Sequence, residues 1–328
     1  MIYDVCIVGG GPCGLSAAIA IKEKGFSYVV LEKGNVVDTI SRYPTHQTFF
    51  STSEKLEIGG VPFVNEERKP KRIHALTYYR EVVKRKELQV NTYEKVISVA
   101  KESDQLFCII TKTQKGQEKV YYSRAAIIAT GYYDHPNMMG VKGEELPHVF
   151  HYFKEGHPFF NEDIVVIGGK NSAIDTALEL QKSGARVTVL YRGKDYSKSI
   201  KPWVLPEFTA QVSQNNIRME FNAVVKEITE DFLFYEKDGK TEKIKADFVF
   251  AMTGYHPDHS FLRKMGVAID EETGRPVHHP DTMETNVENI FICGVIAAGN
   301  NANEIFIENG RFHGELIAKA LSKKINLY

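Results

Sequence analysis

A glycine-rich loop between a strand pattern and a helix pattern occurs twice in this chain, and no other feature constrains the fold as much. In the first copy, the apolar run 2–8 leads into Gly-Gly-Gly-Pro-Cys-Gly at 9–14 and then a helical pattern. In the second copy, the run 163–167 leads into Gly-Gly-Lys-Asn-Ser-Ala at 168–173 and another helical pattern. Each copy predicts a βαβ unit with its glycine loop at the first turn, the arrangement that binds dinucleotides.

The first loop has the glycine spacing of a phosphate-binding turn. Gly9, Gly11 and Gly14 permit a tight turn, close approach of the backbone to a pyrophosphate and close packing of the next helix. The helix N-terminus presents free N–H groups and a positive dipole end to the phosphates. Glu32 ends the next strand pattern and can accept hydrogen bonds from ribose hydroxyls. The residues expected to bind this dinucleotide are Gly9, Gly11, Pro12, Cys13, Gly14, Glu32 and, over the adenine, Lys33.

The second loop departs from that pattern in two places. Lys170 replaces the middle glycine, and Arg192 ends the next strand pattern, where a site for NAD carries an acid. A guanidinium there favours the 2′-phosphate of NADPH, because it donates charge-assisted hydrogen bonds, and Lys198 adds positive charge nearby. A solvated surface arginine is the alternative interpretation. The candidate residues of this site are Gly168, Gly169, Lys170, Asn171, Ser172, Tyr191, Arg192 and Lys194.

Two dinucleotide sites in one chain predict two cofactors. We expect FAD to stay bound over many turnovers and NADPH to come and go, with hydride passing from NADPH to FAD and on to an acceptor. No long linker or low-complexity segment separates the two units, so we expect the second to be inserted within the first. The expected domains are an FAD domain of 1–134 plus 257–328 and an NADPH domain of 135–256.

Composition and charge exclude several other classes of protein. Of 328 residues, 41 are Lys or Arg and 42 are Asp or Glu, so a net charge of −1 provides no field to hold nucleic acid or an anionic membrane. No apolar run approaches the roughly 20 residues of a membrane-spanning helix, and a strand pattern directly after Met1 predicts no signal peptide. Four cysteines without a CxxC or Cys/His cluster predict neither a disulfide scaffold nor a metal site. We therefore expect a cytoplasmic protein.

Three further motifs occur where two-domain flavoproteins carry theirs. Ala129-Thr130-Gly131 follows the strand pattern 125–128, Met252-Thr253-Gly254-Tyr255 follows the pattern 248–251, and residues 285–294 read TNVENIFICG. With the two loops, these motifs resemble the low-molecular-weight thioredoxin reductase architecture over nearly the whole chain. The resemblance implies an α/β fold of two Rossmann-like, three-layer ββα domains. It also implies cofactor contacts at Ala129, Thr130, Gly131, Thr253, Gly254, Gly294 and Val295, although Val295 replaces the aspartate that usually meets the flavin ribityl chain.

The chain lacks the dithiol of thioredoxin reductases. Their CxxC lies just before the second glycine loop, and His151 and Lys154 stand at the matching positions here, so thioredoxin cannot be reduced in that way. The loop 9–14, the segment 43–56 and the loop 167–173 are instead similar to those of bacillithiol disulfide reductases. That resemblance implies an NADPH-dependent FAD enzyme that reduces a low-molecular-weight thiol disulfide, bacillithiol disulfide, to the free thiol.

By the same resemblance, Cys13 is the proposed catalytic thiol. The N–H groups and dipole of a helix N-terminus acidify a cysteine in the first turn, whereas a pyrophosphate beside it opposes ionisation. The alternative is that Cys13 only fills space between packed elements. Cys6 and Cys108 lie in strand patterns and Cys293 precedes Gly294, so these three are expected to be core residues.

The flavin ring is expected near the segment that follows the first unit. Thr45, Phe50 and Ser51 are the candidate contacts there, with an ordinary packed loop as the alternative. Val96 resembles the position whose backbone meets adenine. Ile305 is expected to begin the last helix, over 304–322, whose N-terminus would stabilise charge on a reduced flavin.

Other activities remain open at this point. A ferredoxin or flavodoxin–NADP reductase shares the architecture, also lacks CxxC and needs no substrate thiol, so Cys13 separates it from a disulfide reductase. A flavin monooxygenase needs a glycine-and-histidine signature that residues 150–152 only faintly match, and a redox-sensing flavoprotein would turn over little. The expected partner is a small-molecule disulfide, and the expected assembly is a homo-oligomer, a dimer or a tetramer.

Overall fold

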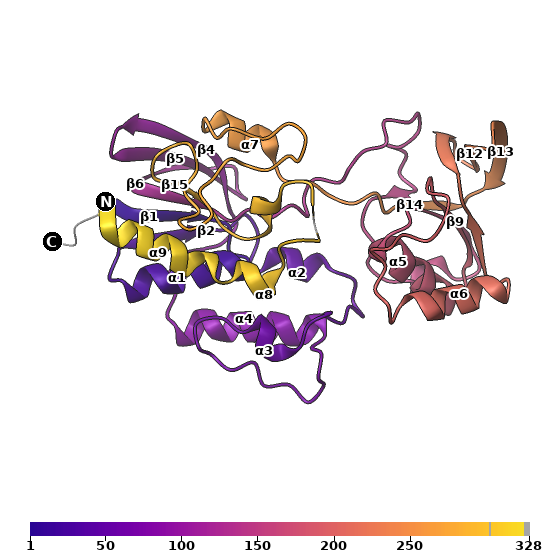
Figure 1. Cartoon of the computed structure of the whole chain (residues 1–328), viewed down its shortest axis with the longest axis horizontal. Helices are drawn as coiled ribbons and strands as arrows, with labels where there is room; N and C mark the ends of the chain where they lie inside the picture. Colours follow the sequence, from indigo (N-terminus) through magenta and orange to yellow (C-terminus); the bar gives the residue numbers. More distant parts are fainter. Residues whose placement is uncertain (302, 325–328) are drawn as a thin grey trace. The chain divides into compact units, whose positions relative to one another are not determined.

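The computed structural model describes residues 1–301 and 303–324, so residue 302 and the last four residues of the expected segment 257–328 lie outside it. The chain divides into two compact units (Figure 1). Unit 1 comprises Met1–His135 with Tyr255–Tyr328, and unit 2 is Pro136–Gly254. Unit 2 is thus inserted into unit 1, and which cofactor each unit holds stays a prediction.

Unit 1 is built on a seven-stranded sheet in the order β3-β2-β1-β6-β5-β4, with β15 also paired to β6. Strands β3, β2, β1, β6 and β15 are parallel, and the hairpin strands β4 and β5 run antiparallel to their neighbours. The bounds are β1 Ile2–Val8, β2 Tyr28–Leu31, β3 Val90–Asn91, β4 Glu94–Ser103, β5 Leu106–Thr113, β6 Glu118–Ile128 and β15 Ile290–Ile292.

Strand β6 belongs to both parts of this sheet. Its first half pairs with β5, from Glu118 to Ser123, and its second half pairs with β1 and β15. The strand expected over 125–128 is therefore the end of a longer strand. A buried, apolar second half lets one strand close both the hairpin and the parallel sheet.

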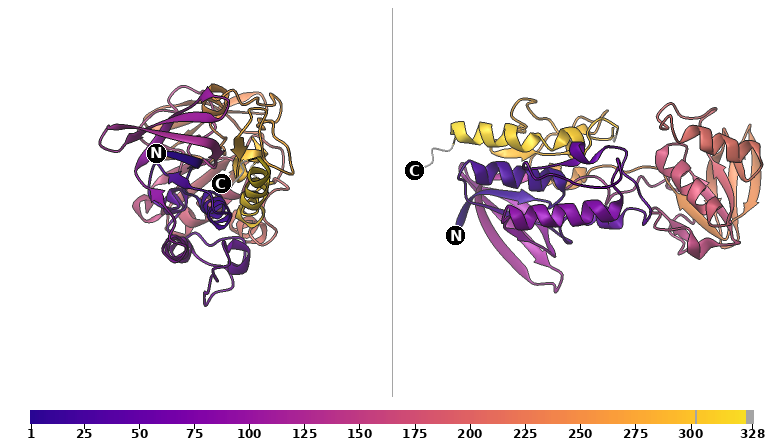
Figure 2. Two further views of the ribbon diagram at one scale, coloured as in Figure 1. Left: turned by 90° about the vertical axis from the view of Figure 1, so that its left-hand side faces the viewer. Right: turned by 90° about the horizontal axis from the view of Figure 1, so that it is seen from below.

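The helices of unit 1 lie along the sheet, with α9 beside α1 in both Figure 1 and Figure 2. The two helices approach closely because Gly314 has no side chain, and a Cβ there would lie 2.5 Å from the Cα of Ala17. The bounds are α1 Pro12–Glu23, α2 Asp38–Arg42, α3 Ser53–Leu56, α4 Arg72–Arg85, α7 His259–Lys264, α8 Ile307–Gly310 and α9 His313–Lys324, with a 3₁₀ turn at Val295–Ala298.

The prediction of a single helix over 304–322 is wrong. The chain forms two helices there, because α8 ends at Gly310 and α9 begins only at His313. Ile305 lies two residues before α8 and begins no helix; the Asn309 side chain accepts a 2.7 Å hydrogen bond from the Phe306 N–H and fixes the start at Ile307. The N-terminus expected at Ile305 thus lies further along the chain.

Unit 2 has three layers. Its five-stranded parallel sheet has the order β10-β9-β8-β14-β7, and a three-stranded antiparallel sheet has the order β11-β12-β13. The bounds are β7 Val149–Phe150, β8 Asp163–Ile167, β9 Arg186–Leu190, β10 Ile217–Glu220, β11 Val224–Ile228, β12 Phe232–Lys237, β13 Lys240–Lys245, β14 Phe248–Ala251, α5 Asn171–Lys182 and α6 Leu205–Ser213, with a 3₁₀ turn at His157–Phe159.

Strand β8 shows how these layers are held together. Ile164 and Val166 pack with the helices α5 and α6, whereas Val165 and Ile167 pack with Leu233 and its neighbours in the antiparallel sheet. Because successive side chains of a strand point to opposite faces, an unbroken apolar run has to be covered on both sides. With the sheets of unit 1, this confirms the expected α/β fold of two Rossmann-like domains.

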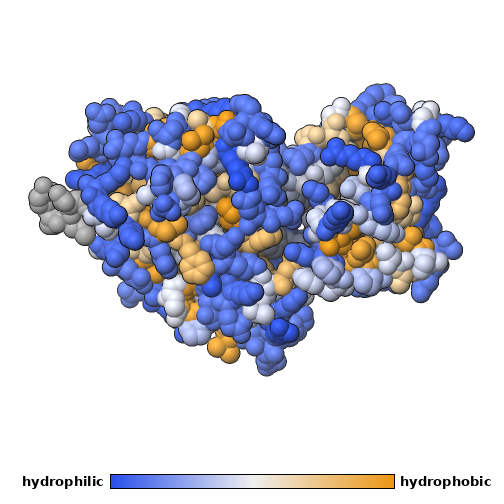
Figure 3. Space-filling model, viewed as in Figure 1, coloured by the Kyte–Doolittle hydropathy of each residue, from blue (hydrophilic) through white to orange (hydrophobic). Residues whose placement is uncertain are grey.

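The face of the molecule drawn in Figure 3 is mainly polar. On this face, hydrophobic side chains occur in small groups separated by hydrophilic ones. Among the helices of the described ranges, none combines the length and the apolar character needed to cross a bilayer.

Candidate functional site

The first glycine loop has a shape that side chains would prevent. Gly9 has a φ of 110°, and a Cβ on it would overlap the carbonyl group of Ala129. A Cβ on Gly14 would overlap the Gly9 carbonyl oxygen, whereas a Cβ on Gly11 would have no atom within 4 Å. Gly9 and Gly14 therefore form the turn, and Gly11 leaves open space at the start of α1, as close approach by a phosphate requires.

Glu32 fastens this loop to the end of β2. Its Oε2 accepts a 2.6 Å hydrogen bond from the Gly10 N–H, and its Oε1 accepts a 2.8 Å bond from the Gly34 N–H. Burial raises the pKa of this carboxyl and outweighs the opposite effect of the two hydrogen bonds. Each carboxylate oxygen keeps a second lone pair, so Glu32 can still accept from a ribose.

An ion-pair network that sequence reasoning missed surrounds Lys33. The Lys33 ammonium pairs with Asp134, and the Nη2 atom of Arg42 lies 2.6 Å from Oδ1 of the same carboxylate. Burial acts to raise the pKa of Asp134, but the two cations hold it below its usual value. Lys33 is thus tied to the segment after β6, and its contact with adenine stays a prediction.

The buried hydroxyl of Thr130 is consistent with a bound dinucleotide next to the first glycine loop. It follows β6 in the Ala129-Thr130-Gly131 motif, where the Ala129 N–H donates to the Val8 carbonyl at 2.8 Å. Its Oγ1 is buried and has no hydrogen-bond partner among the residues that the structure describes. A buried hydroxyl without a partner is costly, so its place beside Gly9 fits a dinucleotide that would satisfy it.

Cys13 lies half-buried in the first turn of α1, against two glycines. A Cβ on Gly310 would lie 3.0 Å from its Sγ, and a Cβ on Gly294 would lie 3.1 Å from it. Burial, with a smaller effect of the Glu308 carboxylate, raises the pKa of the Cys13 thiol to about 12. The expected acidification by the helix N-terminus is therefore wrong for this structure, because desolvation outweighs it.

The segment expected near the flavin ring contacts the C-terminal helices. The Ser51 hydroxyl donates a hydrogen bond to Oε1 of Glu308, which sequence reasoning missed. Phe50 is half-buried, Thr45 is exposed, and Ile305 packs against the core of unit 1. Ser51 and Ile305 thus lie in the part of unit 1 that holds Cys13, while no hydrogen bond or ion pair joins Thr45 to that part among the described residues.

Gly294 contacts His313 at the position where Val295 stands in place of the usual aspartate. The Gly294 N–H donates to Nδ1 of His313 at 3.1 Å, and Val295 begins the 3₁₀ turn that follows. Burial, with a smaller effect of His278, lowers the pKa of His313 to about 4, so this imidazole is neutral at physiological pH. Val96 is a buried residue of β4, and its contact with adenine stays a prediction.

The second glycine loop packs against the end of β9. A Cβ on Gly168 would lie 2.5 Å from the Met252 carbonyl oxygen, and one on Gly169 would overlap the ring of Tyr191. Lys170 is the exposed N-cap residue of α5, and Ser172 is exposed in its first turn. The loop thus presents backbone and a cation at the start of a helix, as an anionic ligand requires.

Two other candidates of this site hold unit 2 together. The Asn171 side chain donates to the Ser199 carbonyl at 2.9 Å and accepts from the Lys201 N–H at 2.9 Å. The Thr253 hydroxyl donates to the Asn137 carbonyl at 2.6 Å, and the Gly254 carbonyl accepts from the Asn137 N–H. Their side chains therefore position the neighbouring loops, and direct contact with a cofactor stays a prediction.

Arg192, Lys194 and Lys198 are exposed cations after β9. Within the described part of the chain, none of the three forms an ion pair. Unlike Arg186 at the start of β9, whose Nε lies 2.6 Å from Asp163, Arg192 is thus available to an anionic ligand. This is the electrostatic arrangement that a 2′-phosphate requires.

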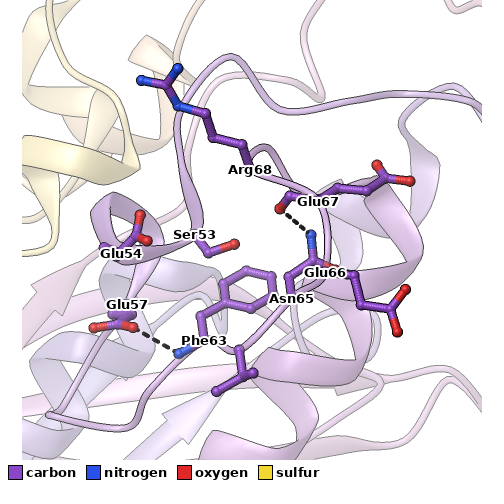
Figure 4. Close-up of a pocket in the computed structure, with 9 residues that line it drawn as sticks. Ser53, Glu54, Glu57, Phe63, Asn65, Glu66, Glu67 and Arg68 are labelled. Atoms are coloured by element: carbon purple, nitrogen blue, oxygen red, sulfur yellow. Dashed lines mark hydrogen bonds between the residues drawn. The ribbon is translucent and has the colours of Figure 1, made fainter.

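A pocket of about 460 Å³ lies elsewhere in unit 1, between α3 and the loop that follows it (Figure 4). The Phe63 N–H donates to Glu57 at 2.8 Å on one side, and Asn65 donates to the Glu67 carbonyl at 2.8 Å on the other. The lining contains four glutamates and one arginine, so its net negative charge disfavours a pyrophosphate. Its lining residues are Ser53, Glu54, Glu57, Phe63, Val64, Asn65, Glu66, Glu67 and Arg68.

The described residues contain no group of three or more His, Cys, Asp or Glu side chains placed to hold a metal ion.

Gly14→Ala should abolish FAD binding. The added methyl group would overlap the Gly9 carbonyl oxygen, so the first loop has to open. The wild type is expected to purify yellow with FAD, and the variant colourless or unfolded, as flavin absorbance and thermal melting would report. Gly25→Ala, after the other end of α1, has no atom within 4 Å of the new Cβ but a φ of 80°, so it should lower stability and still bind FAD. It controls for destabilisation that leaves the loop intact. A yellow Gly14→Ala protein would contradict the assignment of the loop.

Comparison with known proteins places these features in context. The profile of the pyridine nucleotide-disulphide oxidoreductase family matches residues 6–294. The chain is 65% identical over 322 residues to a bacilliredoxin reductase, Bdr, of Bacillus subtilis, covering 98% of each chain. A ferredoxin–NADP reductase of Ignicoccus hospitalis is 27% identical over 300 residues, with 89% and 90% covered.

Among solved structures, those named as bacillithiol disulfide reductases are also far more similar to this chain than a thioredoxin reductase is. The bacillithiol disulfide reductase Bdr of Bacillus cereus is 62% identical with a TM-score of 0.98, covering 99% of this chain and 100% of that one. The Staphylococcus aureus enzyme of the same name is 57% identical with a TM-score of 0.94, and 99% of each chain is covered. A thioredoxin reductase of T. acidophilum, at 23% identity and a TM-score of 0.76 with 98% of each chain covered, shares the fold.

Proposed function

The chain belongs to the pyridine nucleotide-disulphide oxidoreductase family, and from this premise we propose that it uses NADPH and FAD to reduce bacillithiol disulfide to bacillithiol. The observation that carries the proposal is 62% identity over 99% of this chain with a structure named for that activity. Relatives named as ferredoxin–NADP reductases are far more distant, at 24–27% identity, so that activity is the weaker alternative.

Each unit supplies the residues for one cofactor in this proposal. The loop Gly9–Gly14 would hold the pyrophosphate of FAD, Glu32 its ribose, and Thr130 would donate a hydrogen bond to it. The loop at Gly168 would hold the pyrophosphate of NADPH, with Arg192 on its 2′-phosphate. Bound FAD supplies the two-electron carrier that links a hydride donor to a disulfide acceptor.

Cys13 would be the thiol that meets the disulfide. As a thiolate it attacks one sulfur of the substrate, releases one thiol and keeps the other half as a mixed disulfide. The matching positions of the thioredoxin reductase dithiol carry His151 and Lys154, so the described chain offers no second cysteine there to resolve that intermediate. The electrons that release the second thiol would come from NADPH by way of FAD.

A protein acceptor is the second candidate, because the Bacillus subtilis relative is called a bacilliredoxin reductase. A bacilliredoxin that carries a mixed disulfide presents the same sulfur chemistry as the small disulfide. We place either reaction in the cytoplasm, where a reducing environment regenerates thiols, and in a dimer or tetramer of this chain.

Stopped-flow reoxidation of the NADPH-reduced enzyme tests these acceptors directly. Bacillithiol disulfide should reoxidise the flavin rapidly, and glutathione disulfide, ferredoxin and oxygen should do so slowly. A bacilliredoxin mixed disulfide belongs in the same series, because faster reoxidation by it would make the protein the preferred acceptor. Fast reoxidation by ferredoxin alone, with no response to any disulfide, would overturn the proposal.

A further inference from the structure

The segment between β9 and α6 is held against the second glycine loop at both of its ends. At its start, the Tyr191 ring lies so close to the loop that a Cβ on Gly169 would come within 2.4 Å of it. At its end, the Asn171 side chain donates to the Ser199 carbonyl at 2.9 Å and accepts from the Lys201 N–H at 2.9 Å. Because Asn171 is in the first turn of α5, the end of the segment lies beside the helix N-terminus proposed for the pyrophosphate.

The middle of the same segment is anchored in the core of unit 2. Tyr196 makes edge contacts with Phe208 of α6 and with Phe221, at ring-centroid distances of 6.1 and 5.0 Å. Ile200 is buried in the same core. The side chains that the segment leaves exposed are therefore presented from a packed backbone, which holds them in place beside the loop.

Trp203 follows directly on this segment, and 54% of its surface is exposed. It stands in a turn that is closed when the N–H groups of Val204 and Leu205 donate to the Lys201 carbonyl, at 2.9 and 3.2 Å. The Nζ atom of Lys201 lies over the indole ring, 6.0 Å from its centroid, so a cation accompanies the aromatic face. An indole offers a large flat surface while only two side-chain torsions have to be fixed on binding.

We propose that Trp203 stacks on the adenine of NADPH. The inference rests on the coenzyme of the proposed function, whose pyrophosphate lies at the start of α5 and whose 2′-phosphate lies on Arg192. The ribose that carries this phosphate also carries the adenine, so the base lies between the start of α5 and the end of β9. The segment from Arg192 to Trp203 borders that space, because it starts at one of these points and is tied to the other.

The charges of the segment complement the rest of the nucleotide. Lys194 and Lys198 are exposed, and Lys201 adds a third cation beside the indole. The acid among them is Asp195, whose carboxylate accepts a 2.7 Å hydrogen bond from the Tyr196 N–H. A flat aromatic ring for the base, with cations for the phosphates, is a combination that binds nucleotides.

Fluorescence tests the stacking directly, because Trp203 is the single tryptophan of the chain. In the FAD-loaded enzyme, NADP⁺ should quench its emission. Adenosine 2′,5′-bisphosphate should also quench it, since this compound carries the adenine and the 2′-phosphate without the nicotinamide. Nicotinamide mononucleotide, the other half of the coenzyme, should leave the emission unchanged.

Affinity provides a second, independent measurement. By calorimetric titration, Trp203→Ala should raise the Kd for adenosine 2′,5′-bisphosphate about 5- to 150-fold, the range that stacking of one base on an aromatic side chain contributes. Trp203→Phe retains an aromatic ring and should recover part of the affinity.

Phe160→Ala is the matched control. Phe160 is an aromatic residue of unit 2 with 67% of its surface exposed, but it precedes β8 and lies near Gly184, at the opposite end of the parallel sheet from the glycine loop. Its replacement should leave the Kd for the bisphosphate unchanged. FAD content and thermal melting verify that each variant is folded.

The outcomes distinguish failure of this contact from failure of the proposed function. Unchanged emission at saturating NADP⁺, wild-type affinity of Trp203→Ala for the bisphosphate, or quenching by nicotinamide mononucleotide alone would each overturn the stacking, even in an enzyme that reduces bacillithiol disulfide. A wild type that shows the quenching but reduces no disulfide would overturn the proposed function and support the stacking. A wild type that binds neither NADP⁺ nor the bisphosphate would overturn both.

Discussion

Cys13→Ser should bind FAD and accept electrons from NADPH, yet lose turnover with bacillithiol disulfide by roughly 1,000-fold or more. Hydride transfer between the cofactors needs geometry but no thiol, whereas the acceptor step needs a sulfur nucleophile. A serine hydroxyl matches the thiol in size and cannot form a mixed disulfide. Anaerobic stopped-flow absorbance separates the two half-reactions, because the flavin loses its colour in the first and regains it in the second.

Cys108→Ser is the matched control for this substitution. Cys108 is only half-buried in β5, so its expected place in the core is wrong, whereas Cys6 and Cys293 are buried as expected. It lies outside the candidate site, and its replacement should leave both half-reactions unchanged. If Cys13→Ser reduced the disulfide at the wild-type rate, Cys13 would be a packing residue between Gly294 and Gly310. Electrons would then reach the acceptor directly, or the acceptor would be a different molecule.

Arg192→Ala should remove most of a strong preference for NADPH over NADH. A charge-assisted hydrogen bond to a phosphate contributes about 1.5–3 kcal/mol, which corresponds to about 10- to 150-fold in kcat/KM. The loss should appear with NADPH and not with NADH, because only NADPH carries the 2′-phosphate. Steady-state kinetics with both coenzymes measures the ratio.

Arg186→Ala provides the comparison, since it removes a guanidinium from the other end of the same strand. Arg186 is bound to Asp163, so its loss should lower stability and leave the coenzyme ratio unchanged. Equal use of both coenzymes by the wild type would show that Arg192 at the end of β9 does not bind the 2′-phosphate.

The strands of both dinucleotide units could be predicted closely from sequence. The observed bounds of β1 and β8 equal the expected runs 2–8 and 163–167, because each is a short apolar run that ends at a glycine loop. The helices begin three residues earlier than expected, inside the loops, since Pro12 and Asn171 already have helical backbones. The resemblance to bacillithiol disulfide reductases is confirmed by identity over nearly the full chain.

The surroundings of Cys13 could not be predicted, because they depend on residues distant in sequence. Ser51 and Glu308 are 257 positions apart, and Asp134 is 92 positions from Arg42, so no local sequence pattern predicts either contact. The helix N-terminus alone predicts a lowered pKa for the Cys13 thiol. Burial against Gly294 and Gly310 raises this pKa instead.

The arrangement of strands in unit 1 also sets the order in which a newly made chain can fold. β15 pairs with β6, and α9 packs on α1, so unit 1 completes its core only after the final segment has left the ribosome. Unit 2 is one continuous stretch and is synthesised whole before that point. The second glycine loop in the sequence is therefore the first to gain a finished domain around it. Cys13, among the earliest residues made, stays uncovered until Gly294 and Gly310 arrive.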